Sequence, residues 1–156
     1  MKVRVLSVGT KMPAWVQQGI AEYSKRMKGE LDFSLHEIPM AKRSKNSNIQ
    51  QCIQKESDAL LAALPSSDYV VALDVLGKSF STEDLADKII DYRRQGQNLS
   101  LLIGGPDGMS AECLARAAER WSLSSLTFPH PLVRVLITEQ FYRAISIIKG
   151  HPYHRS

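Results

Sequence analysis

The amino-acid sequence predicts an α/β fold with a mostly parallel sheet and helices on both of its faces. The chain has 156 residues, which is close to the usual size of one domain. Segments with the two-residue period of strands alternate with segments of helical period, as is typical of α/β proteins. No repeat, low-complexity tract or linker interrupts this alternation. We therefore expect a single domain over residues 1–156.

Five strands are expected, each an alternating or continuous apolar run; three of them are followed directly by a glycine or a proline, and the run at 69–74 ends in an acidic residue. The run at 69–74 is continuous, which is typical of a buried parallel strand. Gly77 is expected to turn the chain after it. The predicted strands cover residues 3–8, 33–38, 69–74, 99–103 and 123–127.

Five helices are expected between and after these strands. Ser81 and Ser110 can cap two of them, and prolines precede the first and the last. The second helix is expected to turn Ile49, Ile53, Leu60 and Leu64 towards the core. Residues 40–48 are polar and basic and are interpreted as an exposed loop. The predicted helices begin near Pro13, Ile49, Ser81, Ser110 and Pro131, the last two running to about Trp121 and Lys149.

The last helix carries two apolar stripes instead of one. A helix that covers a small sheet needs only one apolar face. The second face predicts a homodimer through this helix. The two stripes are Val133, Ile137, Phe141, Ala144 and Ile148, and Leu132, Val135, Leu136 and Ile145.

Charge is segregated along the chain. The net charge is +5 over residues 1–45, −4 over 46–128 and +3 over 129–156, summing to +4. Basic ends suggest a polyanionic partner such as nucleic acid, although charge alone favours random clustering on a solvated surface. Within residues 40–48, Lys42, Arg43 and Lys45 are either solvated charge or phosphate contacts.

The cysteines and the apolar runs indicate the compartment. Cys52 and Cys113 lie far apart and form no paired framework, so a reducing environment is expected. No apolar run approaches the ~20 residues that span a bilayer, and the N-terminus lacks the layout of a signal peptide. We expect a cytoplasmic protein without a membrane partner.

Ligands of open α/β sheets bind outside the carboxyl ends of the strands. Three segments at such ends are candidates, at 73–74, 103–106 and 126–129. The glycines after Ile103 let backbone groups approach a ligand, but the GGPDG sequence lacks both the phosphate-loop and the dinucleotide-binding pattern. A plain turn is the alternative interpretation.

The C-terminal sequence HPYHR combines groups for proton transfer, base stacking and phosphate recognition. The spacing of His151 and His154 also suggests a metal site, as in a small metal-dependent hydrolase, but no cysteine lies nearby in the sequence. His130, between two prolines, is either a helix-entry residue or an acid, base or orienting donor.

The segments LLIGGPDG (101–108), WSLSSLTFPHPLVRVLITEQFYRA (121–144) and HPYHR (151–155) closely resemble the RlmH family of SPOUT, or α/β-knot, methyltransferases. The segments VGTKMPAWV (8–16) and YVVALDVLGK (69–78) match as well, so the resemblance covers essentially the whole chain. Members methylate N3 of a pseudouridine in 23S ribosomal RNA.

The resemblance implies a homodimeric enzyme with a C-terminal trefoil knot that binds S-adenosylmethionine and needs no metal. By motif matching, the residues that face the target base would be His130, Tyr153, His154 and Arg155. The cofactor would lie against Leu73, Gly104, Leu123, Ser124, Ser125, Leu126, Thr127 and Phe128. The partner implied is 23S ribosomal RNA within the ribosome.

Methylation at N3 requires either that the acidic N3–H lose its proton or that the anion which develops on the base be stabilised. His130 or His154 could accept the proton, Arg155 could stabilise the anion, and Tyr153 could position the base. A competing function, for which the basic ends would suffice, is a non-catalytic RNA- or ribosome-binding factor.

Overall fold

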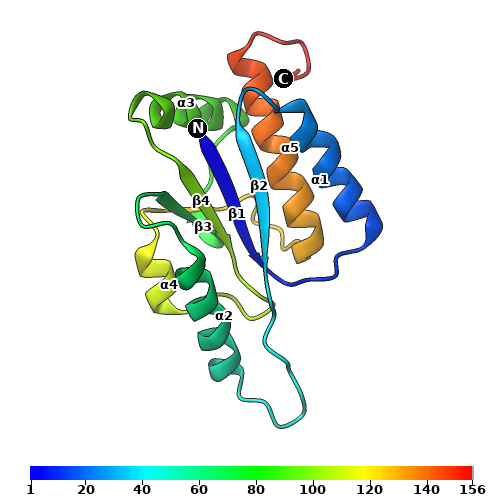
Figure 1. Ribbon diagram of the computed structural model, residues 1–156, viewed down its shortest axis with the longest axis vertical. Helices are drawn as coiled ribbons and strands as arrows, with labels where there is room; N and C mark the ends of the chain where they lie inside the picture. Colours follow the sequence, from blue (N-terminus) through cyan, green and yellow to red (C-terminus); the bar gives the residue numbers. More distant parts are fainter. Residues whose placement is uncertain (156) are drawn as a thin grey trace.

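A sheet of five parallel strands forms the centre of the computed structural model, which describes residues 1–155 (Figure 1). The strand order is β2-β1-β4-β3-β5, and every neighbouring pair is parallel. The predicted parallel sheet is thereby confirmed. The strands are β1 (Lys2–Val8), β2 (Asp32–Ile38), β3 (Tyr69–Lys78), β4 (Leu99–Ile103) and β5 (Glu119–Trp121).

Helices cover both faces of this sheet, as the sequence predicts. Helices α1, α3 and α5 pack on one face, and α2 and α4 on the other. Figure 1 shows α1 and α5 side by side, with α2 and α4 across the sheet from them. The helices are α1 (Ala14–Arg26), α2 (Ile49–Ala63), α3 (Thr82–Arg94), α4 (Ala111–Arg116) and α5 (His130–Ile148).

The alternation of the strand residues explains the two layers. In β1, Val3 and Val5 face the layer of α1, α3 and α5, whereas Leu6 and Val8 face α2. Successive strand side chains point to opposite faces, so a strand that is apolar on both sides is stable only between two helical layers.

The predicted serine caps are present. Ser81 accepts a hydrogen bond from the Asp84 backbone N–H at 3.0 Å, and Asp84 accepts one from the Ser81 N–H at 3.1 Å, a complete capping box. Ser110 accepts from the Cys113 N–H at 3.1 Å and begins α4. These caps satisfy N–H groups that have no partner within the helix.

Gly77 does not turn the chain, which corrects the expectation above. It lies inside β3, which continues beyond Asp74 to Lys78 through a register shift against β5. A Cβ on Gly77 would lie 2.7 Å from the Arg120 carbonyl. The glycine is therefore required for the close approach of two strands.

The fourth helix is shorter than predicted. It ends at Arg116 instead of near Trp121, because Ala117 is extended and the Ala118 N–H donates to the Val70 carbonyl at 2.8 Å. This bond draws the chain into the sheet as β5. Tertiary pairing thus overrides the local helical preference of an alanine-rich segment.

Residues 123–127 form no strand, so that prediction is wrong. The edge next to β3 is already taken by β5, whose Trp121 is buried and packs edge-on against Phe80. The segment after it is an irregular loop in which Leu126 is 70% exposed. Its alternating pattern reflects loop residues around a cavity, not a pleated strand.

The second helix turns only part of the expected face inward. Leu60 is buried as predicted, but Ile49 is 45% exposed, and the buried residues of the helix are Cys52, Glu56, Ser57 and Leu60. Two of these four are polar, and both contact the loop that follows β4.

No helical segment in the described part of the chain combines the length and apolarity that a bilayer crossing needs.

Candidate functional site

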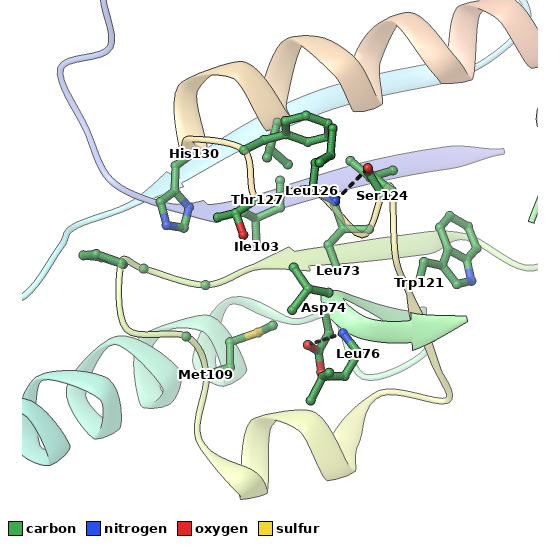
Figure 2. A pocket seen from close by; sticks show the side chains of 18 of the residues that line it. Leu73, Asp74, Leu76, Ile103, Met109, Trp121, Ser124, Leu126, Thr127 and His130 are labelled. Carbon is green, nitrogen blue, oxygen red and sulfur yellow. Dashed lines mark hydrogen bonds between the residues drawn. The ribbon is translucent and has the colours of Figure 1, made fainter. Parts of the chain in front are cut away.

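A cavity of about 470 Å³ opens at the carboxyl ends of β3, β4 and β5 (Figure 2). This is the edge at which ligands bind in open α/β sheets, and the volume suits a small-molecule or cofactor site. Its walls come from the end of β3, the loop after β4, the loop after β5 and the beginning of α5. Its residues include Leu73, Asp74, Leu76, Ile103, Gly104, Met109, Trp121, Leu126, Thr127 and His130.

The structure brings together most of the cofactor-binding residues that the resemblance implies. All but Ser125 line the cavity, and Ser125 lies in the same loop. His130 lines it as well. The lining residues of the expected set are Leu73, Gly104, Leu123, Ser124, Leu126, Thr127 and Phe128.

The glycine loop, residues 104–108, is a compact turn that forms one wall. The Gly108 N–H donates to the Gly105 carbonyl at 3.0 Å, and Gly108 has a φ of +88°, which favours glycine. A Cβ on Gly104 would lie 2.7 Å from Met109 Cγ. Glycine is therefore required at position 104 because the loop packs closely on Gly108 and Met109.

The opposite wall and the rim are apolar. Val75 and Leu76 at the end of β3 are exposed, and Figure 2 shows Leu126 and Thr127 across the cavity from Leu76. Ser124 Oγ accepts a hydrogen bond from the Leu126 N–H at 2.9 Å and fixes the shape of this loop. Exposed apolar side chains around a hollow are typical of a binding site.

His130 is held in its neutral form. Burial lowers the pKa of its imidazole below the usual value of 6.5, and the positive charge of Arg134 lowers it further. A hydrogen bond with the Gly105 backbone and the charge of Glu56 oppose this effect without reversing it. A neutral imidazole at the cavity can accept a proton at pH 7.

Arg134 is a buried residue at this site that the sequence reasoning missed. Its Nη2 donates to the Gly9 carbonyl at 2.7 Å, and its Nη1 contacts Glu37 Oε2 at 2.7 Å. These bonds tie the first turns of α5, and with them His130, to the ends of β1 and β2. The position of this arginine in an otherwise apolar helical sequence could have indicated that it is buried.

The tail residues do not line the cavity of their own chain. The Tyr153 hydroxyl donates to Glu139 Oε1 at 3.0 Å, and its ring packs on Tyr142 with the ring centroids 4.6 Å apart. His154 lies 2.8 Å from a Glu83 carboxylate oxygen, and Arg155 is exposed. The structure therefore separates Tyr153, His154 and Arg155 from His130.

The arginine of the basic loop is not free to meet a phosphate. Arg43 forms ion pairs with Glu56 at 2.6 Å and with Asp107 at 2.9 Å. The interpretation of Arg43 as solvated charge is therefore wrong, and its ion pairs within the chain argue against a phosphate contact. Lys42 and Lys45 are exposed. The burial of Glu56, the partner of Arg43, could have been predicted from the sequence, because Glu56 lies four residues from both Cys52 and Leu60.

Within residues 1–155, no three histidine, cysteine or acidic side chains are grouped as metal ligands. His151 is exposed, and the ring nitrogens of His154 face Glu83 and Arg143. A neighbouring cation disfavours a second positive ion at this place.

Comparison with known proteins gives a consistent assignment. A family model described as "Predicted SPOUT methyltransferase" matches residues 1–154. A protein of Saccharophagus degradans named ribosomal RNA large subunit methyltransferase H is 55% identical, covering 99% of this chain and 100% of its own. Proteins of the same name from a Marinomonas species and from Hahella chejuensis are each 52% identical over 99% of this chain.

A solved structure of a methylase family protein from Neisseria gonorrhoeae has a similar fold. The TM-score is 0.50 at 14% sequence identity, and the match covers 90% of this chain and 81% of that one. At this identity the likeness concerns the fold alone.

Proposed function

Because the chain belongs to the SPOUT methyltransferase family, we propose that it transfers a methyl group from S-adenosylmethionine to N3 of a pseudouridine in 23S ribosomal RNA. The relatives that match its whole length are named ribosomal RNA large subunit methyltransferase H. As an enzyme of ribosomal RNA it would act in the cytoplasm.

One observation carries this proposal. The residues that the family resemblance assigns to the cofactor come from three separate parts of the sequence, yet seven of the eight line one cavity. Leu73, Gly104 and the 123–128 segment meet there although nothing local in the sequence requires it. A pure RNA-binding module has no need for such a cavity beside a neutral histidine.

The cavity suits S-adenosylmethionine in size and character. Gly104 and Gly108 form part of its wall, and Leu73, Leu126 and Phe128 offer apolar surface for an adenosyl group. We propose that Leu123, Ser124, Ser125 and Thr127 complete this site. When bound, S-adenosylmethionine supplies a methyl group on positively charged sulfur, so the site needs no metal.

The protein's own residues prepare the acceptor nitrogen. A protonated imide nitrogen is a poor nucleophile, so the N3 proton must leave or the developing anion must be stabilised. We assign the proton to Nε2 or Nδ1 of His130, whose environment keeps the imidazole neutral. Arg155 then stabilises negative charge on the flanking carbonyl oxygens, and Tyr153 orients the base.

His154 is the alternative proton acceptor. In the structure its Nε2 lies 2.8 Å from Glu83 Oε1 and its Nδ1 lies 3.3 Å from Arg143 Nη1. Both ring nitrogens therefore already have partners, and His154 does not line the cavity. The surroundings of the two histidines therefore favour His130 for this role.

The separation of His130 from the tail leads to a proposal about the assembly. If both act on one base, the tail has to come from a second subunit. A homodimer through α5 would permit this, since α5 carries His130 at its beginning and is followed by the tail. Its Leu132, Val135 and Leu136 remain partly exposed in the protomer. We also propose that the chain forms the C-terminal trefoil knot that the family resemblance implies.

Calorimetric titration with S-adenosylmethionine tests the proposal against the alternatives. We expect heat of binding at a stoichiometry of one per chain. Absence of heat at millimolar ligand would favour a non-catalytic ribosome-binding factor. A metal-dependent hydrolase instead predicts bound metal after purification and loss of activity with a chelator.

A further inference from the structure

We propose that Arg43 is a positioning residue for the cofactor site, because it ties the glycine loop (residues 104–108) through Asp107 and Glu56. This inference rests on the proposed function, since the loop is a wall of the proposed S-adenosylmethionine site. Arg43 lies in the basic segment 40–48, which is far from the cavity in sequence and does not line it.

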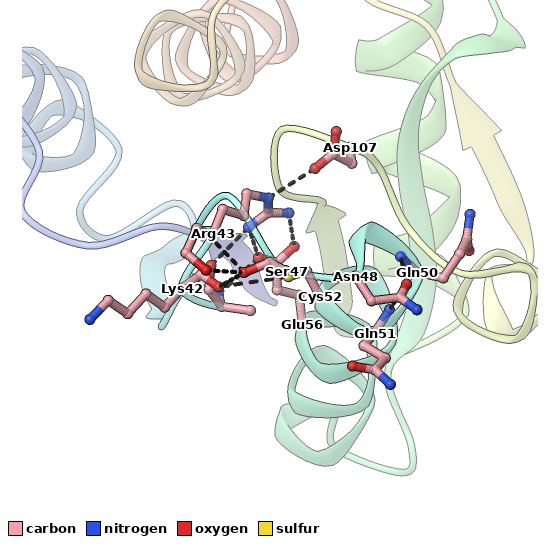
Figure 3. A network of polar contacts seen from close by, with 11 residues as sticks. Lys42, Arg43, Ser47, Asn48, Gln50, Gln51, Cys52, Glu56 and Asp107 are labelled. Carbon is pink, nitrogen blue, oxygen red and sulfur yellow. Dashed lines mark hydrogen bonds and ion pairs between the residues drawn. The ribbon is translucent and has the colours of Figure 1, made fainter.

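Arg43 uses all of its nitrogens on groups of this chain (Figure 3). Nη1 donates to Glu56 Oε2 at 2.6 Å and to the Ala41 carbonyl at 3.0 Å, and Nη2 donates to Glu56 Oε1 at 3.1 Å. The third nitrogen, Nε, donates to Asp107 Oδ2 at 2.9 Å. The guanidinium therefore joins α2 to the tip of the glycine loop.

Glu56 contacts the same loop at a second point. A Cβ on Gly105 would lie 2.4 Å from Glu56 Oε1, so the loop backbone rests directly on this carboxylate. One turn of α2 thus reaches both the beginning of the loop, at Gly105, and its tip, at Asp107 through Arg43. The next residue, Ser57, accepts from the Ser110 N–H at 2.9 Å just beyond the loop.

The arrangement demands a cation at position 43. Glu56 is 1% exposed, and a buried carboxylate without a partner is strongly destabilising. Besides the two bonds from Arg43, Glu56 accepts one from the Ala41 N–H at 2.9 Å. Glu56 raises the pKa of the Arg43 guanidinium above its usual value, and Asp107 does so to a lesser degree. Arg43 is thus a stable cation between the two carboxylates.

Only an arginine can satisfy both carboxylates at once. The two terminal nitrogens of its guanidinium face Glu56, and Nε faces Asp107 on another side. A lysine ammonium lacks this forked arrangement of donors. The three donors of a lysine lie on one nitrogen, so a lysine that retains the buried Glu56 contact does not replace the separate Nε contact with Asp107. Arg43→Lys therefore removes the link to the loop while keeping the buried charge paired.

A loop that is already fixed in the bound conformation needs no ordering, whereas a flexible loop loses conformational freedom when the ligand binds. Rigid preorganisation improves affinity by removing this cost. Asp107 is the safer site for a test, because its side chain is 35% exposed and Arg43 keeps Glu56 when it is changed. Its loss therefore loosens the loop without uncovering a buried charge.

The experiment measures the dissociation constant of S-adenosylmethionine by calorimetry for the wild type, Asp107→Asn, Asp107→Glu and Lys45→Ala. We expect Asp107→Asn to weaken binding about three- to tenfold, as for the loss of one charged hydrogen bond. Asp107→Glu, which retains the carboxylate, and Lys45→Ala, which removes a charge from the same segment, should bind as the wild type does. Unfolding midpoints without ligand should agree within about 3 °C.

A double-mutant cycle with Arg43→Lys separates positioning from direct contact. If Asp107 acts through Arg43, the double variant Arg43→Lys/Asp107→Asn binds no more weakly than either single variant. If Asp107 touches the cofactor itself, the two effects multiply, and the inference is wrong.

Two further results would also overturn the inference. One is an unchanged dissociation constant in Asp107→Asn, and the other is a loss in Asp107→Glu equal to that in Asp107→Asn. A wild-type protein that binds no S-adenosylmethionine contradicts the proposed function itself. The two failures are therefore distinguishable.

Discussion

His130 and Tyr153 lie apart in the protomer, although both are expected to face the same base. His130 lines the cavity at the beginning of α5, whereas the Tyr153 hydroxyl contacts Glu139, nine residues further along this helix. Nine residues correspond to about 14 Å along a helix axis. Figure 1 shows the C-terminus near the far end of α5 from its beginning. This separation supports the proposal that a second subunit supplies the tail.

Mixed dimers test this arrangement. Thr127→Trp should fill the cavity from its exposed wall, and Arg155→Ala should remove the proposed anion-stabilising charge, so each variant alone should be nearly inactive. In an equal mixture, half of the dimers are mixed, and each of these has one intact site of two. We therefore expect about one quarter of wild-type methyl transfer after subunit exchange, by simple combinatorics of a shared site.

A site within one chain gives a different result. Each mixed dimer then carries two defective sites, and mixing restores no activity. Full activity of Arg155→Ala alone would show that the arginine has no role in the reaction.

The lowered pKa of His130 predicts a pH profile for methyl transfer. Burial and Arg134 favour the neutral imidazole, so activity should hold as the pH falls through 6.5, the usual value, and decrease only below it. His130→Asn should lower the single-turnover rate about 100-fold, as for a lost general base, and remove the acidic limb. If His154→Asn abolishes this limb instead, the proton acceptor is His154.

The basic segment 40–48 predicts a salt dependence of ribosome binding. Arg43 is paired within the chain, so the charges available for phosphates are those of Lys42 and Lys45. The double variant Lys42→Ala/Lys45→Ala should reduce the slope of log K against log salt by about one to two. Arg94→Ala on α3 is a matched control with an exposed side chain and should leave the slope unchanged. An unchanged slope in the lysine variant would exclude contact of this segment with RNA.

Glu119 predicts a loss of stability in acid. Burial by itself raises the pKa of this carboxyl, but hydrogen bonds from Lys88, Tyr69, Trp121 and Tyr92 together lower it to about 2. A carboxyl with a lowered pKa stabilises the fold above its unfolded pKa, here 4.5, and this stabilisation is lost as the pH falls towards 2.

The measurement is urea unfolding of the wild type and Glu119→Gln between pH 7 and pH 2. We expect a difference on the order of 2–3 kcal/mol at pH 7 that shrinks below pH 4.5. Glu112→Gln, at an exposed position on α4, should show no such difference. A difference that is independent of pH would contradict this account of Glu119.

The sequence was sufficient to predict the layers of the fold, because the signals are local. The alternation of Val3 and Val5 with Leu6 and Val8 requires two helical layers, and Ser81 and Ser110 mark helix beginnings through their own hydrogen bonds. Where pairing between distant segments decides the structure, the predictions failed. The bond from the Ala118 N–H to Val70 ends α4, and it cannot be inferred from either segment alone.

The site shows the same division. Motifs and strand ends predicted which segments would meet at the cavity. The pairing of Glu56 with Arg43 and the distance between His130 and the tail were not predictable, since each depends on how α2 and α5 pack. A charged residue inside an apolar stripe, as at Glu56 and Arg134, indicates that its side chain is buried, and this indication could have been used.

Methylation of ribosomes from a strain that lacks this protein tests the central claim most directly. The enzyme is incubated with these ribosomes and labelled S-adenosylmethionine, and the modified nucleotide is mapped. We predict label at N3 of one pseudouridine in 23S ribosomal RNA. Label on protein or on uridine, or no label at all, would contradict the proposed function.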